Sequence, residues 1–190
     1  MISLTDYKIF RDNMSTLMDT SLDDHNGVKT YMTKSTLPAV NFDNVKSEYV
    51  KILKLAETPK SNDALYADIY GRVVFVEFKN GFMDKAKQHG VRKKIYDSSL
   101  IFTDIVGIGI SKMRQFVEYI LVYNEKANPE TITEREKHVQ NSPSFDLIAR
   151  TVSKFGKVEY IRYGVDIFKN YCYKDVHTYT ETEFEEFLNK

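Results

Sequence analysis

The segment from Asn62 to Gly81, NDALYADIYGRVVFVEFKNG, constrains the fold of this chain more than any other. It holds two runs rich in Val, Phe and Tyr, 63–69 and 72–79, on either side of a short stretch that contains Gly71. This arrangement is typical of two antiparallel strands joined by a tight loop whose glycine adopts the left-handed backbone conformation. The sequence therefore predicts a β-hairpin with its loop at 69–71.

The position of the loop decides which side chains share a face of the hairpin. With Asp68 opposite Arg72, Asp63 lies directly opposite Glu77. Because side chains alternate along a strand, both carboxylates and Lys79 fall on a face that is otherwise apolar, and the opposite face is apolar as well. A two-residue Tyr-Gly turn would instead shift the register by one residue and move Asp63 to the other face.

Two carboxylates on a covered apolar face need compensation, because each buried charge is costly unless it is paired and the two charges repel each other. Lys79 can offset one of them, and the oxygen atoms of Asp63 and Glu77 suit Mg²⁺ or Mn²⁺. The alternative is a solvated charged face at the end of a strand. The spacing thus predicts a divalent metal site, with an exposed ion pair as the alternative.

These residues resemble the motif of the PD-(D/E)XK nuclease superfamily, in which an Asp opens one strand and the next strand ends in Glu-x-Lys. Here Asp63 is followed by VVFVEFK, which ends in Glu77 and Lys79, while Asn62 stands where the family name has a Pro. The similarity in element order covers about 44–124. The resemblance implies an α/β fold with a restriction-endonuclease-like core, a central mixed β-sheet flanked by helices.

The resemblance also implies roles for these residues in phosphodiester hydrolysis. Asp63 and Glu77 would bind one or two Mg²⁺ ions together with the backbone carbonyl of Phe78, and Lys79 would position or activate the attacking water. Asp68 is a rival acidic residue, but five residues of extended strand place it about 17 Å from Asp63.

Helices on either side of the hairpin often add residues to sites of this family. Glu48, on the helix predicted at 44–57, is the acidic candidate, and its alternative is an exposed helix charge. A basic residue on the helix predicted at 91–108, Lys93 or Lys94, would contact a phosphate. The basic stretch KAKQHGVRKK would guide the nucleic acid through five residues, namely Lys85, Lys87, Arg92, Lys93 and Lys94.

Two classes of function follow from these patterns. The first is a Mg²⁺-dependent nuclease acting on DNA or RNA, of a kind that by analogy would suit phage defence or a mobile element. The second is a catalytically silent nuclease-fold protein that binds protein or nucleic acid, such as an inhibitor or immunity protein. The zero net charge and the acidic tail TETEFEEF favour the second class, and the complete trio of Asp63, Glu77 and Lys79 favours the first. A homodimer or a regulatory protein partner is open in either case.

The length of 190 residues predicts a single domain, with the core at 44–124 and an α/β extension at 125–190 packed on it. In the extension, SFDLIARTVSKFG predicts a helix at 144–156, NYCYKDVHTY a strand at 170–179, and Thr180 with Glu183 the capping box of a final acidic helix.

A cytoplasmic protein without a membrane partner is expected from the remaining composition. The start of the chain does not resemble a secretory signal, and the most apolar later run, LIFTDIVGIGI, is too short to span a bilayer. Cys172 is the only cysteine, which excludes an internal disulfide and a Cys-rich zinc site.

Overall fold

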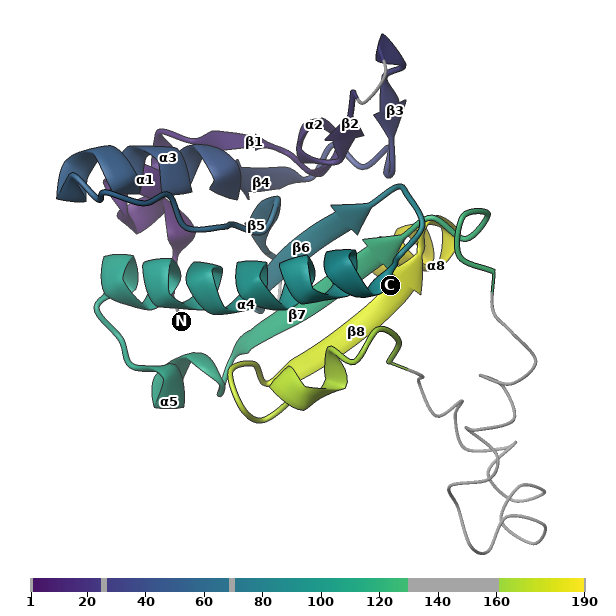
Figure 1. Ribbon diagram of the computed structural model, residues 1–190. Helices are drawn as coiled ribbons and strands as arrows, with labels where there is room; N and C mark the ends of the chain where they lie inside the picture. Colours follow the sequence, from purple (N-terminus) through teal and green to yellow (C-terminus); the bar gives the residue numbers. More distant parts are fainter. Residues whose placement is uncertain (1, 25–26, 69–70, 130–160, 190) are drawn as a thin grey trace, which may run out of the picture.

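The computed structural model describes residues 2–24, 27–68, 71–129 and 161–189, which form an α/β fold around a six-stranded mixed sheet (Figure 1). Across the sheet, the strands lie in the order β1 (Met14–Thr16), β4 (Pro38–Asn41), β5 (Ala64–Ala67), β6 (Val73–Lys79), β7 (Val117–Tyr123) and β8 (Asp175–Thr180). Neighbouring strands from β1 to β6 are antiparallel, whereas β6, β7 and β8 are parallel. The predicted central mixed sheet is therefore confirmed.

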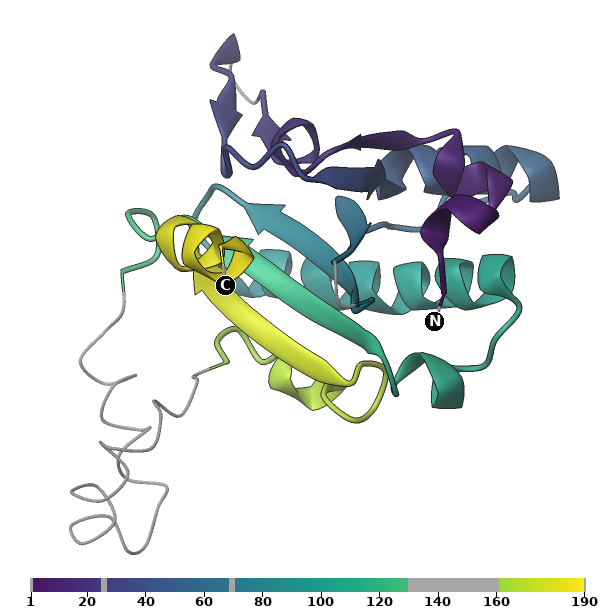
Figure 2. The ribbon, with the colours of Figure 1, turned by 180° about the vertical axis from the view of Figure 1, so that it is seen from behind.

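Helices cover both faces of this sheet. The long helix α4 (Lys85–Val106) runs along one face in Figure 1, and α8 (Glu181–Leu188) lies against the opposite face in Figure 2. The remaining elements are η1 (Leu4–Asp6), α1 (Lys8–Arg11), α2 (Leu17–Thr20), α3 (Phe42–Leu53), α5 (Ile110–Met113), η3 (Asp166–Phe168) and a second, two-stranded sheet of β2 (Leu22–Asp23) and β3 (Thr30–Tyr31). None of the helices in the described part of the chain has both the length and the apolar character of a membrane span.

The hairpin of β5 and β6 has the predicted register. Leu65 pairs with Phe75, and Ala67 pairs with Val73. At the loop, the Gly71 N–H donates to the Asp68 carbonyl at 3.0 Å, and Gly71 has a φ of 77°. Extended by one residue beyond the first pair of β5, this register places Asp63 opposite Glu77, as the loop position predicted.

Both faces of the hairpin are buried, as its composition predicted. Leu65 and Phe75 belong to one apolar cluster, which includes residues of α3 and α4. Tyr66 and Val74 belong to a second cluster on the other face, together with Phe184 of α8. Any charged group at the end of this hairpin therefore lies next to a dry core on both sides.

Two helix boundaries differ from the prediction, and both differences move residues of the candidate site. Helix α3 begins at Phe42, after the N-cap Asn41, and ends before Lys54, which has a left-handed φ of 54°. Helix α4 begins at Lys85 because the Asp84 side chain accepts a hydrogen bond from the Lys87 N–H at 2.8 Å. The prediction that α4 starts at 91 was wrong because this cap outweighs the glycine at position 90.

The C-terminal part of the chain adds an edge to the central sheet. Strand β8 runs parallel to β7 from the pair Glu118–Asp175 to the pair Tyr123–Thr180. The predicted capping box is confirmed, since the Thr180 side chain accepts from the Glu183 N–H and the Glu183 side chain from the Thr180 N–H. The helix predicted at 144–156 lies outside the described residues.

Replacing Gly71 by Ala should lower the free energy of unfolding by about 1–2 kcal/mol, because an L side chain is strained at positive φ. Gly90→Ala is the matched control. It lies inside α4, and the Cβ that alanine adds there would meet open space, so the same substitution should raise stability by about 0.5–1 kcal/mol. Urea denaturation of the two variants measures both changes, and equal effects would contradict the loop geometry.

Candidate active site

A cluster of two carboxylates and two ammonium groups lies where β5 begins and β6 ends. The Lys94 Nζ donates to Asp63 Oδ1 at 2.9 Å and to Glu77 Oε1 at 2.6 Å. The Lys79 ammonium also pairs with Glu77 Oε1. The structure thus brings Asp63, Glu77 and Lys79 together, and the cation between the two carboxylates is the side chain of Lys94.

Asp63 is held at this place through its backbone neighbours and its own side chain. The Asn62 N–H donates to Ser98 Oγ on α4 at 2.8 Å, and the Phe42 N–H at the start of α3 donates to the Asp63 carbonyl at 3.1 Å. Asp63 Oδ2 accepts from the Phe78 N–H at 2.7 Å. Contacts to α3, α4 and β6 therefore fix the carboxylate relative to three elements.

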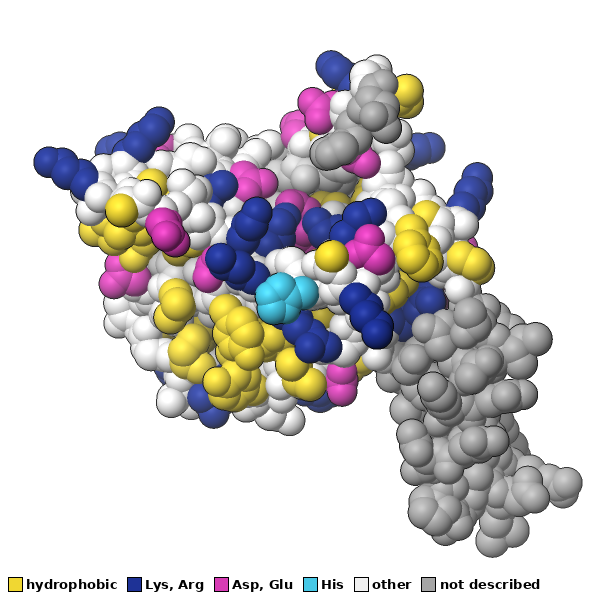
Figure 3. Space-filling model, in the orientation of Figure 1, with side chains coloured by type: hydrophobic (Ala, Val, Ile, Leu, Met, Phe, Trp, Pro, Cys, Tyr) yellow, Lys and Arg dark blue, Asp and Glu magenta, His cyan; other side chains and the backbone are white. Residues whose placement is uncertain are grey.

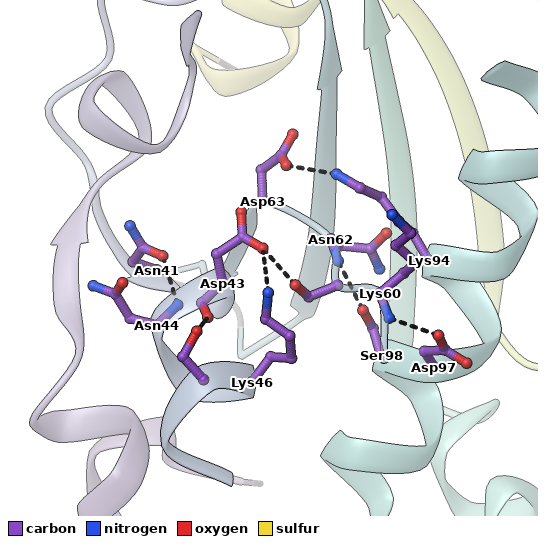
Figure 4. Close-up of polar contacts among 12 residues, drawn as sticks. Asn41, Asp43, Asn44, Lys46, Lys60, Asn62, Asp63, Lys94, Asp97 and Ser98 are labelled. Carbon is purple, nitrogen blue, oxygen red and sulfur yellow. Dashed lines mark hydrogen bonds and ion pairs between the residues drawn. The ribbon is translucent and has the colours of Figure 1, made fainter. Parts of the chain in front are cut away.

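The helix phase of α4 brings Lys94 to the site and leaves its neighbour outside. Lys94 lies one turn before Ser98, the residue that holds Asn62, so both project from one face of the helix toward the start of β5 (Figure 4). Lys93, one position earlier, is exposed. The buried positions Val91 and Ile95 mark this face in the sequence, and their spacing could have separated Lys94 from Lys93.

The cluster lies in surroundings that disfavour charge. Glu77 is completely buried, and within the described residues its Oε2 atom has no hydrogen-bond partner. Burial and the neighbouring Glu77 raise the pKa of Asp63 to about 6, although Lys94 and Lys79 oppose the shift. Burial also disfavours the charge on Lys94, but Glu77 and Asp63 outweigh it and hold the pKa of Lys94 above its usual range.

A cleft of about 620 Å³ opens beside the cluster. Asp63 and Lys79 reach it from the hairpin, and Lys87 reaches it from the first turn of α4. The wall opposite the hairpin comes from the N-terminal segment and α3, and comprises Thr20, Ser21, Leu22, Asp23, Asp24, Met32 and Asp43.

Asp43 is the acidic residue that α3 contributes to the cleft, and the sequence analysis did not single it out. It lies in the first turn of α3, and Figure 4 shows it extending from there toward Asp63. One of its oxygens accepts from the Ser61 hydroxyl at 2.5 Å and faces Lys46 at 3.5 Å. The N-cap residue Asn41 in NFDN is the sequence signal that places Asp43 at a helix start.

The structure does not bring Glu48, the predicted acidic residue of this helix, to the cluster. Its carboxylate accepts from the Asn13 side chain at 2.9 Å and does not line the cleft. Because α3 starts at Phe42, Glu48 lies about 7.5 Å beyond Asp43 along the helix and about 140° around it. Of these two acidic residues of α3, Asp43 lines the cleft and Glu48 does not.

The predicted basic residues fall into three groups. Lys and Arg side chains gather over the N-terminal half of α4 in Figure 3. Of these, Lys87 lines the cleft, while Lys85 and Lys93 are exposed. Lys94 is bound to the carboxylates, and the Arg92 guanidinium packs directly over Gly164. Only some of the stretch is thus free to meet a polyanion.

The cluster offers some of the oxygen ligands that a divalent cation needs. Among the described residues, no three His, Cys, Asp or Glu side chains already form a metal-binding group. Asp63 and Glu77 supply two carboxylates, and Glu77 Oε2 is a buried oxygen that lacks a partner. Because the N–H and C=O of a strand residue point to the same side, the Phe78 carbonyl also faces Asp63. A metal ion can bind here only if the Lys94 ammonium withdraws.

Replacing Lys94 by Met should lower the free energy of unfolding by about 3–5 kcal/mol, because the buried Glu77 and the partly buried Asp63 then lose their shared cation. Lys93→Met is the control, because Lys93 is exposed, and should change stability by less than about 0.5 kcal/mol. Urea denaturation in EDTA measures both. A similar small effect of both substitutions would contradict the bridging position of Lys94.

The raised pKa of Asp63 predicts a pH dependence of stability in EDTA. Between its ordinary value of 3.8 and about 6, the folded protein binds more protons at Asp63 than the unfolded chain. The wild-type stability relative to Asp63→Asn should therefore fall by about 3 kcal/mol as pH rises through this window, and should level off above it. Denaturation curves of both proteins at several pH values test this, and a difference that rises with pH would contradict the buried position.

Comparisons with protein-family models, with curated proteins and with solved structures found no match to this chain. The family resemblance of the hairpin motif therefore stays a prediction.

Proposed function

We propose that this protein is a Mg²⁺-dependent nuclease that hydrolyses phosphodiester bonds of DNA or RNA. The observation that carries the proposal is the convergence of Asp63 and Glu77 on one cation, with Lys79 beside them, at the edge of a cleft. A stable core gains little from such a cluster, since hydrophobic residues in place of a buried ion pair are often as stable. The cost of burying these charges is therefore an argument for a chemical role.

The residues that would hold the metal ion are Asp63, Glu77 and the Phe78 carbonyl, with Asp43 on the opposite wall of the cleft as a further oxygen ligand. When bound, Mg²⁺ or Mn²⁺ supplies Lewis-acid stabilisation of the charge that grows on the phosphate and lowers the pKa of a coordinated water. The raised pKa of Asp63 means that this ligand set is complete only above about pH 6 in the absence of the metal.

The two lysines of the cluster have distinct roles in this proposal. Lys79, at the cleft, orients the attacking water and stabilises the developing charge on the phosphate oxygens. Lys94 balances the charge of the two carboxylates. With a metal ion held by these carboxylates, the Lys94 ammonium would be free to contact a phosphate. In the reaction, a water oxygen bonds to phosphorus, the phosphodiester P–O bond breaks, and the leaving oxygen takes up a proton.

The arrangement around the cluster supports a restriction-endonuclease-like core of the PD-(D/E)XK type. Helix α3, the β5–β6 hairpin, helix α4 and strand β7 follow in the order that the resemblance implied. The parallel pairing of β6 and β7 makes the sheet mixed at this point. Membership of that superfamily, a cytoplasmic location and a role in phage defence or on a mobile element belong to this proposal.

A second candidate function, a catalytically silent binding module, is favoured by one observation. The Lys94 ammonium already satisfies both carboxylates at 2.9 and 2.6 Å, so the cluster is charge-balanced without any metal ion. In that case, the fold would serve as an inhibitor, an immunity protein or a nucleic-acid-binding subunit. Metal binding separates the two functions, because the silent module has no use for Mg²⁺.

In the presence of Mg²⁺ or Mn²⁺, the protein should cleave at least one of three substrates, namely single-stranded DNA, duplex DNA and RNA. Asp63→Asn, Glu77→Gln and Lys79→Met should each lower the rate by about 100-fold or more. The first two substitutions remove ligands of the metal ion, and the third removes a cation that stabilises the transition state. Asp43→Asn should also reduce cleavage, by weakening metal binding, which a calorimetric titration with Mn²⁺ measures.

Glu48→Gln is the matched control. Its carboxylate bonds to Asn13 outside the cleft, so cleavage should be unchanged. Cleavage that survives the three substitutions at Asp63, Glu77 and Lys79 would contradict the site. Absence of both cleavage and metal binding in the wild-type protein would favour the silent binding module.

A further inference from the structure

An exposed aromatic ring lies beside the candidate active site. Phe82 follows β6 in the loop to α4, and 65% of its surface is accessible. The two residues before it, Asn80 and Gly81, line the cleft, and so does Lys87 after it. A phenylalanine this exposed would ordinarily lower its free energy by turning inward.

The backbone on both sides of Phe82 is held so that the ring stays outside. The side chain of the buried Asn128 accepts from the Met83 N–H at 2.8 Å and donates to the Gly81 carbonyl at 3.1 Å. Lys87 Nζ donates to the carbonyl of Phe82 itself at 2.9 Å. Met83, the next residue, is buried in the core. These contacts hold the backbone of the loop on both sides of Phe82, whose ring is exposed.

The charges around this ring are unevenly distributed. Lys79 and Lys87 line the cleft before and after Phe82 in the chain, and Lys87 contacts the Phe82 carbonyl, whereas Asp23 and Asp24 lie on the N-terminal wall. Phosphates are attracted to the lysines and repelled by the carboxylates. Asp23 already accepts from the Asn80 side chain at 2.9 Å, whereas the exposed Asp24 can accept a hydrogen bond from a base amino group. This polarity suits a nucleotide whose base is free to leave a stack.

The size of the cleft points in the same direction. Its volume of about 620 Å³ falls within the roughly 300–1,000 Å³ that is common for small-ligand pockets. Such a cleft has room for one or two nucleotides with splayed bases. Aromatic side chains stack unpaired bases of any sequence, and a ring held in advance loses little entropy on binding.

We propose that the cleft binds unpaired nucleotides of single-stranded DNA or RNA, with a base stacked on Phe82 and the adjoining phosphates at Lys79 and Lys87. This inference rests on the proposed nuclease function and names its substrate class. Single-stranded DNA and single-stranded RNA both offer unpaired bases and phosphates. The binding experiment below therefore compares the two.

Fluorescence anisotropy with a labelled 12-nucleotide strand tests the inference, in EDTA and again in Ca²⁺. The probes are single-stranded DNA, single-stranded RNA, a blunt duplex of the same sequence, and an abasic strand that keeps the phosphates but lacks bases. Single-stranded DNA, single-stranded RNA or both should bind more tightly than the duplex. Phe82→Ala should weaken single-strand binding by roughly 5- to 100-fold, and Phe82→Trp should restore it.

Two controls make the result specific to base stacking. Phe82→Ala should change binding of the abasic strand by less than twofold, because only the phosphates contribute there. Neither Phe82 nor Tyr171 is itself among the residues that line the cleft, but Phe82 directly follows the lining residue Gly81. Tyr171→Ala removes a comparably exposed aromatic ring, 55% accessible, that has no lining residue next to it in the chain, and should leave affinity for every probe unchanged.

The outcomes distinguish this inference from the proposed function. If Phe82→Ala binds single strands as tightly as the wild-type protein, or if the duplex binds as tightly as the single strands, the inference is wrong. Cleavage that depends on Asp63 would in that case still support the nuclease. If the wild-type protein neither binds nor cleaves any probe, both the inference and the proposed function are wrong.

Discussion

The contact on which the candidate site depends is the double hydrogen bond from the Lys94 ammonium to Asp63 and Glu77. It joins the start of β5, the end of β6 and helix α4 in one charge-balanced cluster. Without this cation, two carboxylates would face each other beside an apolar core, where their repulsion is screened less than in bulk water. The arrangement of α4 against the hairpin and the electrostatics of the cleft are therefore coupled.

The cluster also explains why the hairpin can end in charged residues although both of its faces are apolar. Glu77 is completely buried, and yet one of its oxygens has two ammonium partners while the other, within the described residues, has none. A group that is buried, charged and only half satisfied is costly for stability and useful for chemistry. In the proposed metal site, the unpaired oxygen of Glu77 would serve as a metal ligand. In the proposed silent module, the same oxygen would lower the stability of the fold and have no chemical role.

Several features of the site followed from local sequence rules. Gly71 set the loop, the loop set the register, and the alternation of side chains then placed Asp63 opposite Glu77. These inferences succeed because they involve neighbours along two short strands, where geometry is almost fixed by backbone hydrogen bonding. The start of α4 was predicted too late because the basic residues from Lys85 onward continue the helix from its N-cap Asp84.

The sequence by itself determined the hairpin, its register and the placement of Asp63, Glu77 and Lys79 on one face, because all of these depend on local periodicity. Only the tertiary structure decided that Lys94 lies between the carboxylates and that Asp43 rather than Glu48 reaches the cleft. The physical reason is that the phase of a helix against a sheet depends on where the helix begins and on what its buried side packs against. A shift of one residue turns a side chain by about 100°, enough to remove it from a site.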